Sequence, residues 1–174
     1  MENVNGGLSD DMLHKIKVSK GDFIFIPSGR LHAIGGGVVI FEIQQNSDTT
    51  YRVHDWGRTD SDGNSRELHI NEALRSIDFQ DVGPCKGRME NNFLVRCPYF
   101  EVEQLNLSSM ESINASIDEN FAIISVIEGT LSFGRYDFRR GDSFIVPSQS
   151  GAEPLSLISN GLTKFLRTTI PKKN

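Results

Sequence analysis

Three polar side chains in the first third of the chain have the types that metal binding and proton transfer require. His32 follows a Pro-Ser-Gly turn after a short apolar run, where an imidazole can ligate a metal ion. Glu42 lies in an otherwise apolar run, and a carboxylate in such a place can transfer a proton. Arg52 ends a β-prone run, and a fixed guanidinium can stabilise developing negative charge. The ordinary interpretations are a surface histidine, an edge-strand glutamate in solvent, and an arginine paired with Asp48 or Asp55.

These three residues are carried by short apolar runs that are bounded by turn residues. Runs of this kind, which occur along most of the chain, predict strands far more often than helices. Strands are expected at residues 22–27, 38–44, 100–107, 121–128, 130–133, 143–147 and 162–170. Two short helices are expected, at residues 10–16 and after a capping Asn71. The pattern predicts an all-β fold of the antiparallel sandwich or barrel type.

An internal repeat divides the chain. A basic residue, Gly, Asp, an apolar run and Pro-Ser occur at residues 20–28 and again at 140–148. Two copies imply two related β units, which we place at residues 1–82 and 93–174 with a polar linker at 83–92. The core of the second unit is expected to form around the following apolar residues: Phe100, Phe121, Ile123, Phe133, Phe144 and Phe165.

Composition narrows the class of protein. The chain has 18 basic and 23 acidic side chains and a net charge of −5, which argues against nucleic acid or a membrane surface as the main partner. Its 11 Phe residues allow a real core, and its 2 cysteines form no C-x-x-C motif. No leader or membrane-spanning stretch is expected, so we predict a cytoplasmic protein.

Residues 21–32 have the pattern Gly-Asp-x4-Pro-x-Gly-x2-His, which resembles the second conserved motif of the cupin superfamily. The stretch from Glu42 to Val53, followed by Arg58 and residues 66–69, is more specific. It resembles the type I mannose-6-phosphate isomerases in their short bacterial form. The resemblance is strong over residues 15–77 and looser beyond. It implies cupin jelly-roll units, an incomplete first one followed by a complete second one.

The resemblance also implies a function. The family interconverts mannose 6-phosphate and fructose 6-phosphate with one zinc ion. His32 matches its last zinc-binding histidine, Arg52 its active-site arginine, and Glu42 a pocket glutamate considered for proton transfer. Asp48 and Arg58 match other polar pocket positions and are expected to bind the substrate, a phosphorylated hexose.

The metal site is expected to be incomplete in this chain. The family's other zinc ligands lie well upstream of the Gly-Asp motif, which begins here at residue 21. Residues 116–122 match the other cupin motif without a histidine, and Ala152 stands where the first unit has His32, so a non-metal second unit is expected. Two alternatives stay open: a non-catalytic cupin module, or half of a split enzyme. Unpaired strands within residues 23–44 predict self-association.

Overall fold

The computed structural model describes residues 13–81, 83, 86–115, 120–148 and 155–172. Contacts between residues divide the chain into two units, residues 1–86 and 87–174. The division falls inside the polar segment that we expected to be a linker. Of the helix expected at residues 10–16, residues 13–16 are described and form no helix, so the prediction is wrong there; residues 10–12 lie outside the described residues, as does Ala152.

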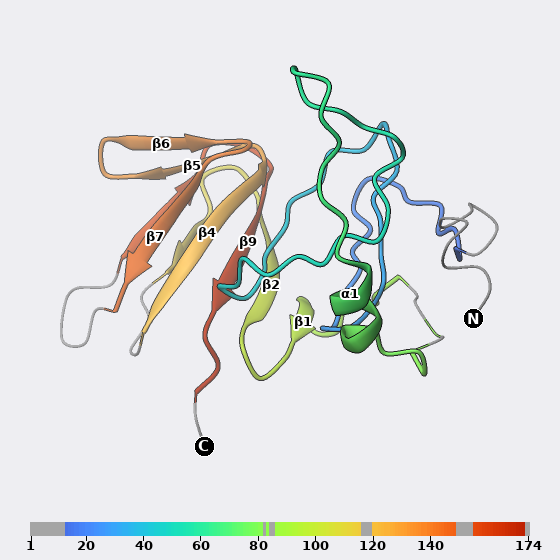
Figure 1. Cartoon of the computed structure of the whole chain (residues 1–174). Coiled ribbons are helices and arrows are strands. Elements are labelled where there is room, and N and C mark those ends of the chain that lie inside the picture. Colours follow the sequence, from blue (N-terminus) through green and yellow to red (C-terminus); the bar gives the residue numbers. More distant parts are fainter. Residues whose placement is uncertain (1–12, 82, 84–85, 116–119, 149–154, 173–174) are drawn as a thin grey trace. The chain divides into compact units, whose positions relative to one another are not determined.

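The described part of the first unit consists of extended segments, turns and one helix (Figure 1). The helix, α1 (Ile70–Ser76), confirms the second expected helix, but Asn71 lies inside it and His69 occupies the N-cap position. The strands expected at residues 22–27 and 38–44 are not formed, and this part of the prediction is wrong. A β-strand requires a ladder of hydrogen bonds to a neighbour, and the described part of the chain provides none for these two segments.

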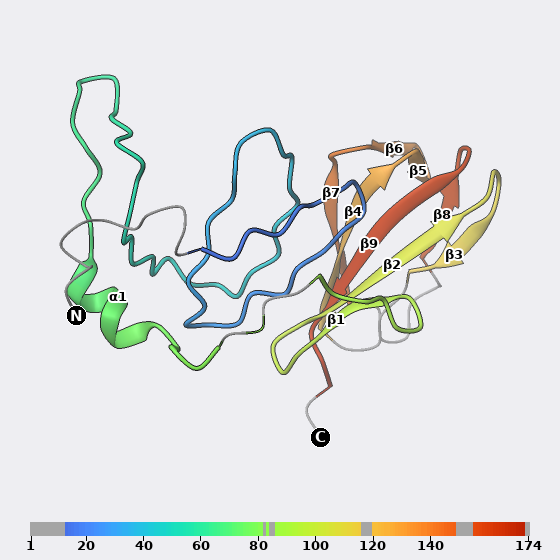
Figure 2. The same ribbon diagram turned by 90° about the vertical axis from the view of Figure 1, so that its right-hand side faces the viewer.

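The second unit is an antiparallel two-sheet structure (Figures 1 and 2). Its strands are β1 (Phe93–Arg96), β2 (Glu101–Leu107), β3 (Ser112–Asn114), β4 (Phe121–Glu128), β5 (Thr130–Phe133), β6 (Tyr136–Arg139), β7 (Ser143–Pro147), β8 (Ser156–Ser159) and β9 (Thr163–Thr169). One sheet has the order β1-β2-β9-β4-β7 and the other β3-β8-β5-β6. The all-β prediction is confirmed, and β4, β5 and β7 have the expected bounds.

The core of the second unit uses a different face of β4 from the one expected. Ile124 and Val126 are buried, whereas Phe121 is 39% exposed. Phe165 is buried as expected, but Phe133 is 40% exposed. Side chains alternate across a strand, so the inward direction of one residue decides the direction of all the others.

The repeated Gly-Asp turn has the same geometry in both units. The carboxylates of Asp22 and Asp142 each accept a hydrogen bond of 2.7 Å from the backbone N–H three residues earlier. The preceding glycines, Gly21 and Gly141, have φ angles of 96° and 95°, which favour glycine because it lacks a Cβ. The second turn leads into β7, and the first leads into an extended segment.

Candidate functional site

The segment from residue 51 to residue 69, here called the 51–69 loop, runs out and back within the first unit (Figures 1 and 2). An isolated antiparallel bridge joins Thr59 to Ser65. At the tip, a carboxylate oxygen of Asp60 accepts hydrogen bonds from the backbone N–H groups of Asp62 and Asn64, at 2.9 and 2.8 Å. These contacts hold the outgoing leg, residues 51–59, beside the returning leg, residues 64–69.

Arg52 lies at the base of this loop and is held by the returning leg. Its backbone N–H donates to Nδ1 of His69 over 3.3 Å, and the His69 N–H donates to the Arg52 carbonyl over 2.8 Å. The guanidinium of Arg52 donates to the carbonyl of Glu67 over 3.4 Å. Arg52 is half-buried. Its guanidinium is therefore bonded to a neutral carbonyl, and no ion pair among the described residues involves it.

Asp55 forms an ion pair with Arg66 across the two legs. Nε of Arg66 donates to Oδ2 of Asp55 over 2.8 Å, and a second nitrogen of the same guanidinium bonds to Oδ1. Hydrogen bonding to Arg66 lowers the pKa of Asp55 below its ordinary value, although burial acts to raise it. The charges of Arg52 and Arg58 lower this pKa further. Asp55 thus pairs with Arg66, and the alternative in which it pairs with Arg52 is wrong.

The other expected site residues lie on exposed parts of the first unit. Glu42, Asp48 and Arg58 are exposed, and the guanidinium carbon of Arg58 lies 6.0 Å from the centroid of the Trp56 ring. In the described part of the chain, no hydrogen bond or ion pair joins Glu42 or Asp48 to Arg52. The structure therefore builds a defined environment for Arg52 and leaves the roles of the other residues as predictions.

His32 follows a turn that is tied to the end of the first unit. Its Nδ1 lies 3.0 Å from the carbonyl of Arg30. Arg30 forms a two-point ion pair with Asp81, with bonds of 2.5 and 2.7 Å. The N–H of Asp78 donates to the carbonyl of Gly29 over 2.9 Å. These contacts fix the turn that carries the imidazole.

The described residues do not make a zinc site. They contain no group of three or more His, Cys, Asp or Glu side chains that could hold a metal ion. His32 offers one imidazole, whereas zinc in proteins takes at least three protein ligands. Zinc binding by this chain would require further ligands from outside the described residues.

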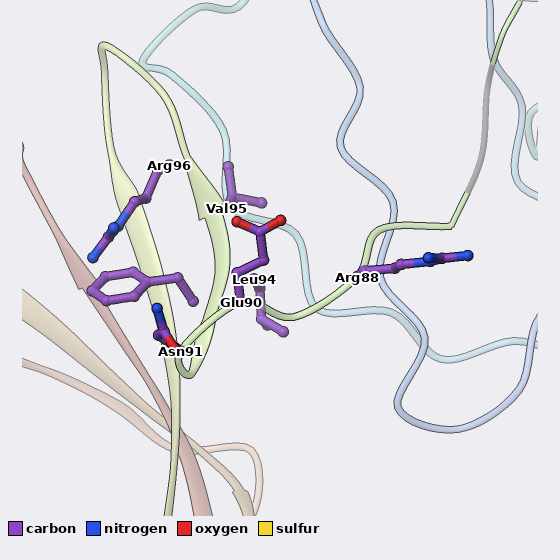
Figure 3. A pocket seen from close by; sticks show the side chains of 7 residues that line it. Arg88, Glu90, Asn91, Leu94, Val95 and Arg96 are labelled. Carbon is purple, nitrogen blue, oxygen red and sulfur yellow. The ribbon is translucent and has the colours of Figure 1, made fainter.

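A cavity of about 230 Å³ lies in the second unit beside β1 and contains none of the expected site residues. Figure 3 shows that its two arginines do not converge, since Arg88 points away from the strand. Arg96 lies over the Phe93 ring, 3.5 Å from its centroid, and 3.6 Å from a carboxylate oxygen of Glu101. The cavity therefore offers no pair of cations for an anionic ligand.

Sequence reasoning missed two parts of this site. His69 bonds to both backbone groups of Arg52, and Arg66 holds the one buried carboxylate of the loop. The only sequence signal was their place in the motif at residues 66–69, which says nothing of their partners. In the described part of the chain, no helix is long and apolar enough to cross a membrane.

Comparison with known proteins finds similarity to a cupin domain in the second unit. Residues 89–157 match the family model described as mannose-6-phosphate isomerase, cupin domain. The crystal structure of the mannose 6-phosphate isomerase from Bacillus subtilis matches 72% of this chain and 41% of its own, with a TM-score of 0.55 and 29% identity.

Two curated sequence relatives carry the same name as the matching family model. Mannose-6-phosphate isomerase ManA of Bacillus subtilis is 37% identical over 83% of this chain and 49% of its own length. Mannose-6-phosphate isomerase of Streptococcus mutans is 38% identical over 80% of this chain and 46% of its own. The chain is therefore similar in sequence to proteins named mannose-6-phosphate isomerase, and it spans about half the length of the curated relatives that it matches.

Proposed function

We propose that the chain forms part of a sugar-phosphate isomerase that interconverts mannose 6-phosphate and fructose 6-phosphate. The observation that carries this proposal is the 37% identity over 83% of the chain to a protein named mannose-6-phosphate isomerase. The setting of Arg52 supports it, because His69 holds the Arg52 backbone and the Glu67 carbonyl holds its guanidinium, and a guanidinium fixed in this way is suited to an anionic reaction partner.

The proposed chemistry moves a proton between two neighbouring sugar carbons. Such an aldose–ketose isomerisation passes through an enediolate, whose negative charge the guanidinium of Arg52 stabilises. Glu42 is the proposed proton carrier. Asp48 is assigned to the sugar hydroxyl groups and Arg58 to the phosphate. Bound zinc would polarise a sugar oxygen, and His32 is proposed as one of its ligands.

A second candidate function is half of a split enzyme, with the remaining strands supplied by another chain. The exposed apolar side chains of the first unit favour it. Val39 is 96% exposed, Ile40 52% and Phe41 47%, and an isolated apolar segment of this kind recruits other chains. Self-association through residues 23–44 is proposed on the same ground. A non-catalytic cupin module is the third candidate. The cytoplasmic location stays part of the proposal.

A chimera tests the isomerase proposal. The part of the Bacillus subtilis relative that this chain does not match is joined to residues 1–174, and turnover of mannose 6-phosphate is measured. We expect activity in the chimera and little in the chain alone. Arg52→Lys should remove most of it, while Arg140→Lys, an exposed arginine of the second unit, serves as the matched control.

A zinc-loaded, folded chimera without turnover would contradict the isomerase proposal and leave the non-catalytic module. Turnover on the order of 10 per second by the chain alone would contradict the need for further residues.

A further inference from the structure

Asp55 is a charged residue that is buried in a unit whose other described residues are almost all exposed or half-buried. Among the described residues of the first unit, only Asp55 and Ala73 are buried, at 8% and 2% exposure. A buried carboxylate without a partner is unfavourable. Arg66 supplies that partner by a two-point bond, while the Arg66 side chain itself remains 49% exposed.

Two other guanidiniums lie near this carboxylate and are not paired with it. Arg52 and Arg58 both act electrostatically on Asp55. The N–H of Arg58 donates to the Asp55 carbonyl over 3.0 Å, so the turn at residues 55–58 keeps Arg58 close. In the described part of the chain, no ion pair involves Arg52 or Arg58. Asp55 would therefore be a competing anion for both if Arg66 did not occupy it.

Arg66 also sits where it sets the position of Arg52. It directly precedes Glu67, whose carbonyl accepts the bond from the Arg52 guanidinium. The Asp55–Arg66 pair and the Arg52–His69 bonds lie on the same two legs of the 51–69 loop. Holding the two legs in one register keeps the Glu67 carbonyl opposite Arg52.

We propose that Arg66 is a positioning residue, which occupies the Asp55 carboxylate and thereby leaves the guanidiniums of Arg52 and Arg58 available to the anionic substrate. This inference rests on the proposed function for the substrate, a sugar phosphate. A two-point guanidinium–carboxylate bond suits the task because it is directional and satisfies both carboxylate oxygens.

The proposal predicts that a double variant is less impaired than the single variant Arg66→Gln. Arg66→Gln removes the guanidinium partner of Asp55, so the carboxylate of Asp55 should capture Arg52 or Arg58. Asp55→Asn together with Arg66→Gln releases the captured guanidinium, because a neutral amide replaces the carboxylate. The double variant should therefore resemble the wild type more closely than the single variant does, both in the NMR signals of Arg52 and Arg58 and in kcat. If Arg66 served only to hold the loop together, the double variant would be at least as impaired as the single one.

Two measurements test this predicted recovery in the double variant. In the full chain, the side-chain Nε–Hε NMR signals of Arg52 and Arg58 report a new carboxylate partner without any need for activity. One of them should shift in Arg66→Gln and return close to its original position in the double variant. In the chimera, kcat should fall about tenfold or more in Arg66→Gln, the scale of a lost charged hydrogen bond, and recover most of that loss in the double variant.

Asp60→Asn is the matched control, since it removes a carboxylate of the same loop that bonds to backbone groups at the tip. The fluorescence of Trp56, the single tryptophan of the chain, reports whether the loop stays folded. Unchanged Arg52 and Arg58 signals in a folded Arg66→Gln variant would overturn the proposal. An inactive wild-type chimera would contradict the proposed function alone, and the NMR signals would then decide the role of Arg66.

Discussion

Gly129→Ala is expected to disrupt the junction between the two sheets of the second unit. Gly129 joins β4 to β5 with a φ of +80°. A Cβ at this position would lie 2.5 Å from the Leu162 carbonyl oxygen and 2.5 Å from Oγ1 of Thr163. Thr163 is itself bonded to Thr130, since its hydroxyl donates to the Thr130 carbonyl over 3.1 Å and accepts from the Thr130 N–H over 3.2 Å. The added methyl group must push the start of β9 away from this contact.

A matched glycine separates strain from crowding. Gly134, between β5 and β6, also has a positive φ of +57°, but a Cβ there would meet nothing within 4 Å. In both alanine variants, the left-handed backbone conformation lowers the free energy of unfolding by about 1–2 kcal/mol. Alanine also reduces the conformational entropy of the unfolded chain, which raises the free energy of unfolding by about 0.4–1 kcal/mol. Gly129→Ala adds about 1–3 kcal/mol for overpacking.

The assay is thermal unfolding followed by far-UV circular dichroism. In a unit of this size, 1 kcal/mol corresponds to roughly 4–8 °C, so Gly129→Ala should lower the midpoint by about 10 °C more than Gly134→Ala. Trp56 lies in the first unit, and its fluorescence should be unaffected by either change if the two units fold separately. Equal midpoints for the two variants would refute the close approach at Gly129.

Three further predictions concern the first unit. In the chimera, Arg52→Lys should lower turnover by about a hundredfold, the scale of one lost preorganised donor, with zinc content unchanged, whereas His32→Ala should lose zinc first; normal turnover in Arg52→Lys would remove its catalytic role. Val39→Glu should reduce self-association measured by light scattering, because Val39 is 96% exposed; a monomeric wild type at high concentration would contradict this. Hydrogen bonding to Arg30 lowers the pKa of Asp81. This pair therefore stabilises the unit fully at pH values above the ordinary carboxyl pKa, and the stabilisation is lost as pH falls from there through the lowered pKa of the folded unit. The drop in the urea midpoint of tryptophan fluorescence caused by Asp81→Asn should therefore be smaller at pH 3 than at pH 7, and an equal drop at both values would exclude the ion pair as its cause.

Local patterns in the sequence are sufficient for several elements. Residue order alone indicates the two Gly-Asp turns, and they have the same hydrogen bond and nearly the same φ. The bounds of β4, β5 and β7 are also predictable, because β-prone runs ending in Gly or Pro are local signals. The residue types around Arg52 are enough to indicate the resemblance to mannose-6-phosphate isomerases, and the sequence relatives bear that resemblance out.

Local sequence patterns do not predict which residues that are distant in sequence pack or pair with one another. The prediction for the inward face of β4 is wrong because alternation tells which residues share a face and not which face meets the other sheet; packing chose Ile124 over Phe121. Residues 22–27 and 38–44 have strand-like sequences, yet a strand also needs a neighbour to pair with.

The sequence by itself determined the turns, most strands of the second unit and the types of chemistry-bearing residue, since these depend on neighbours along the chain. Only the tertiary structure decided that Asp55 pairs with Arg66 and that His69 and Glu67 hold Arg52. Three arginines lie within 11 residues of that one carboxylate, and sequence distance does not rank them. The choice among them is made by which backbone legs lie side by side, because a guanidinium can bond a carboxylate at two points only where both are brought into reach.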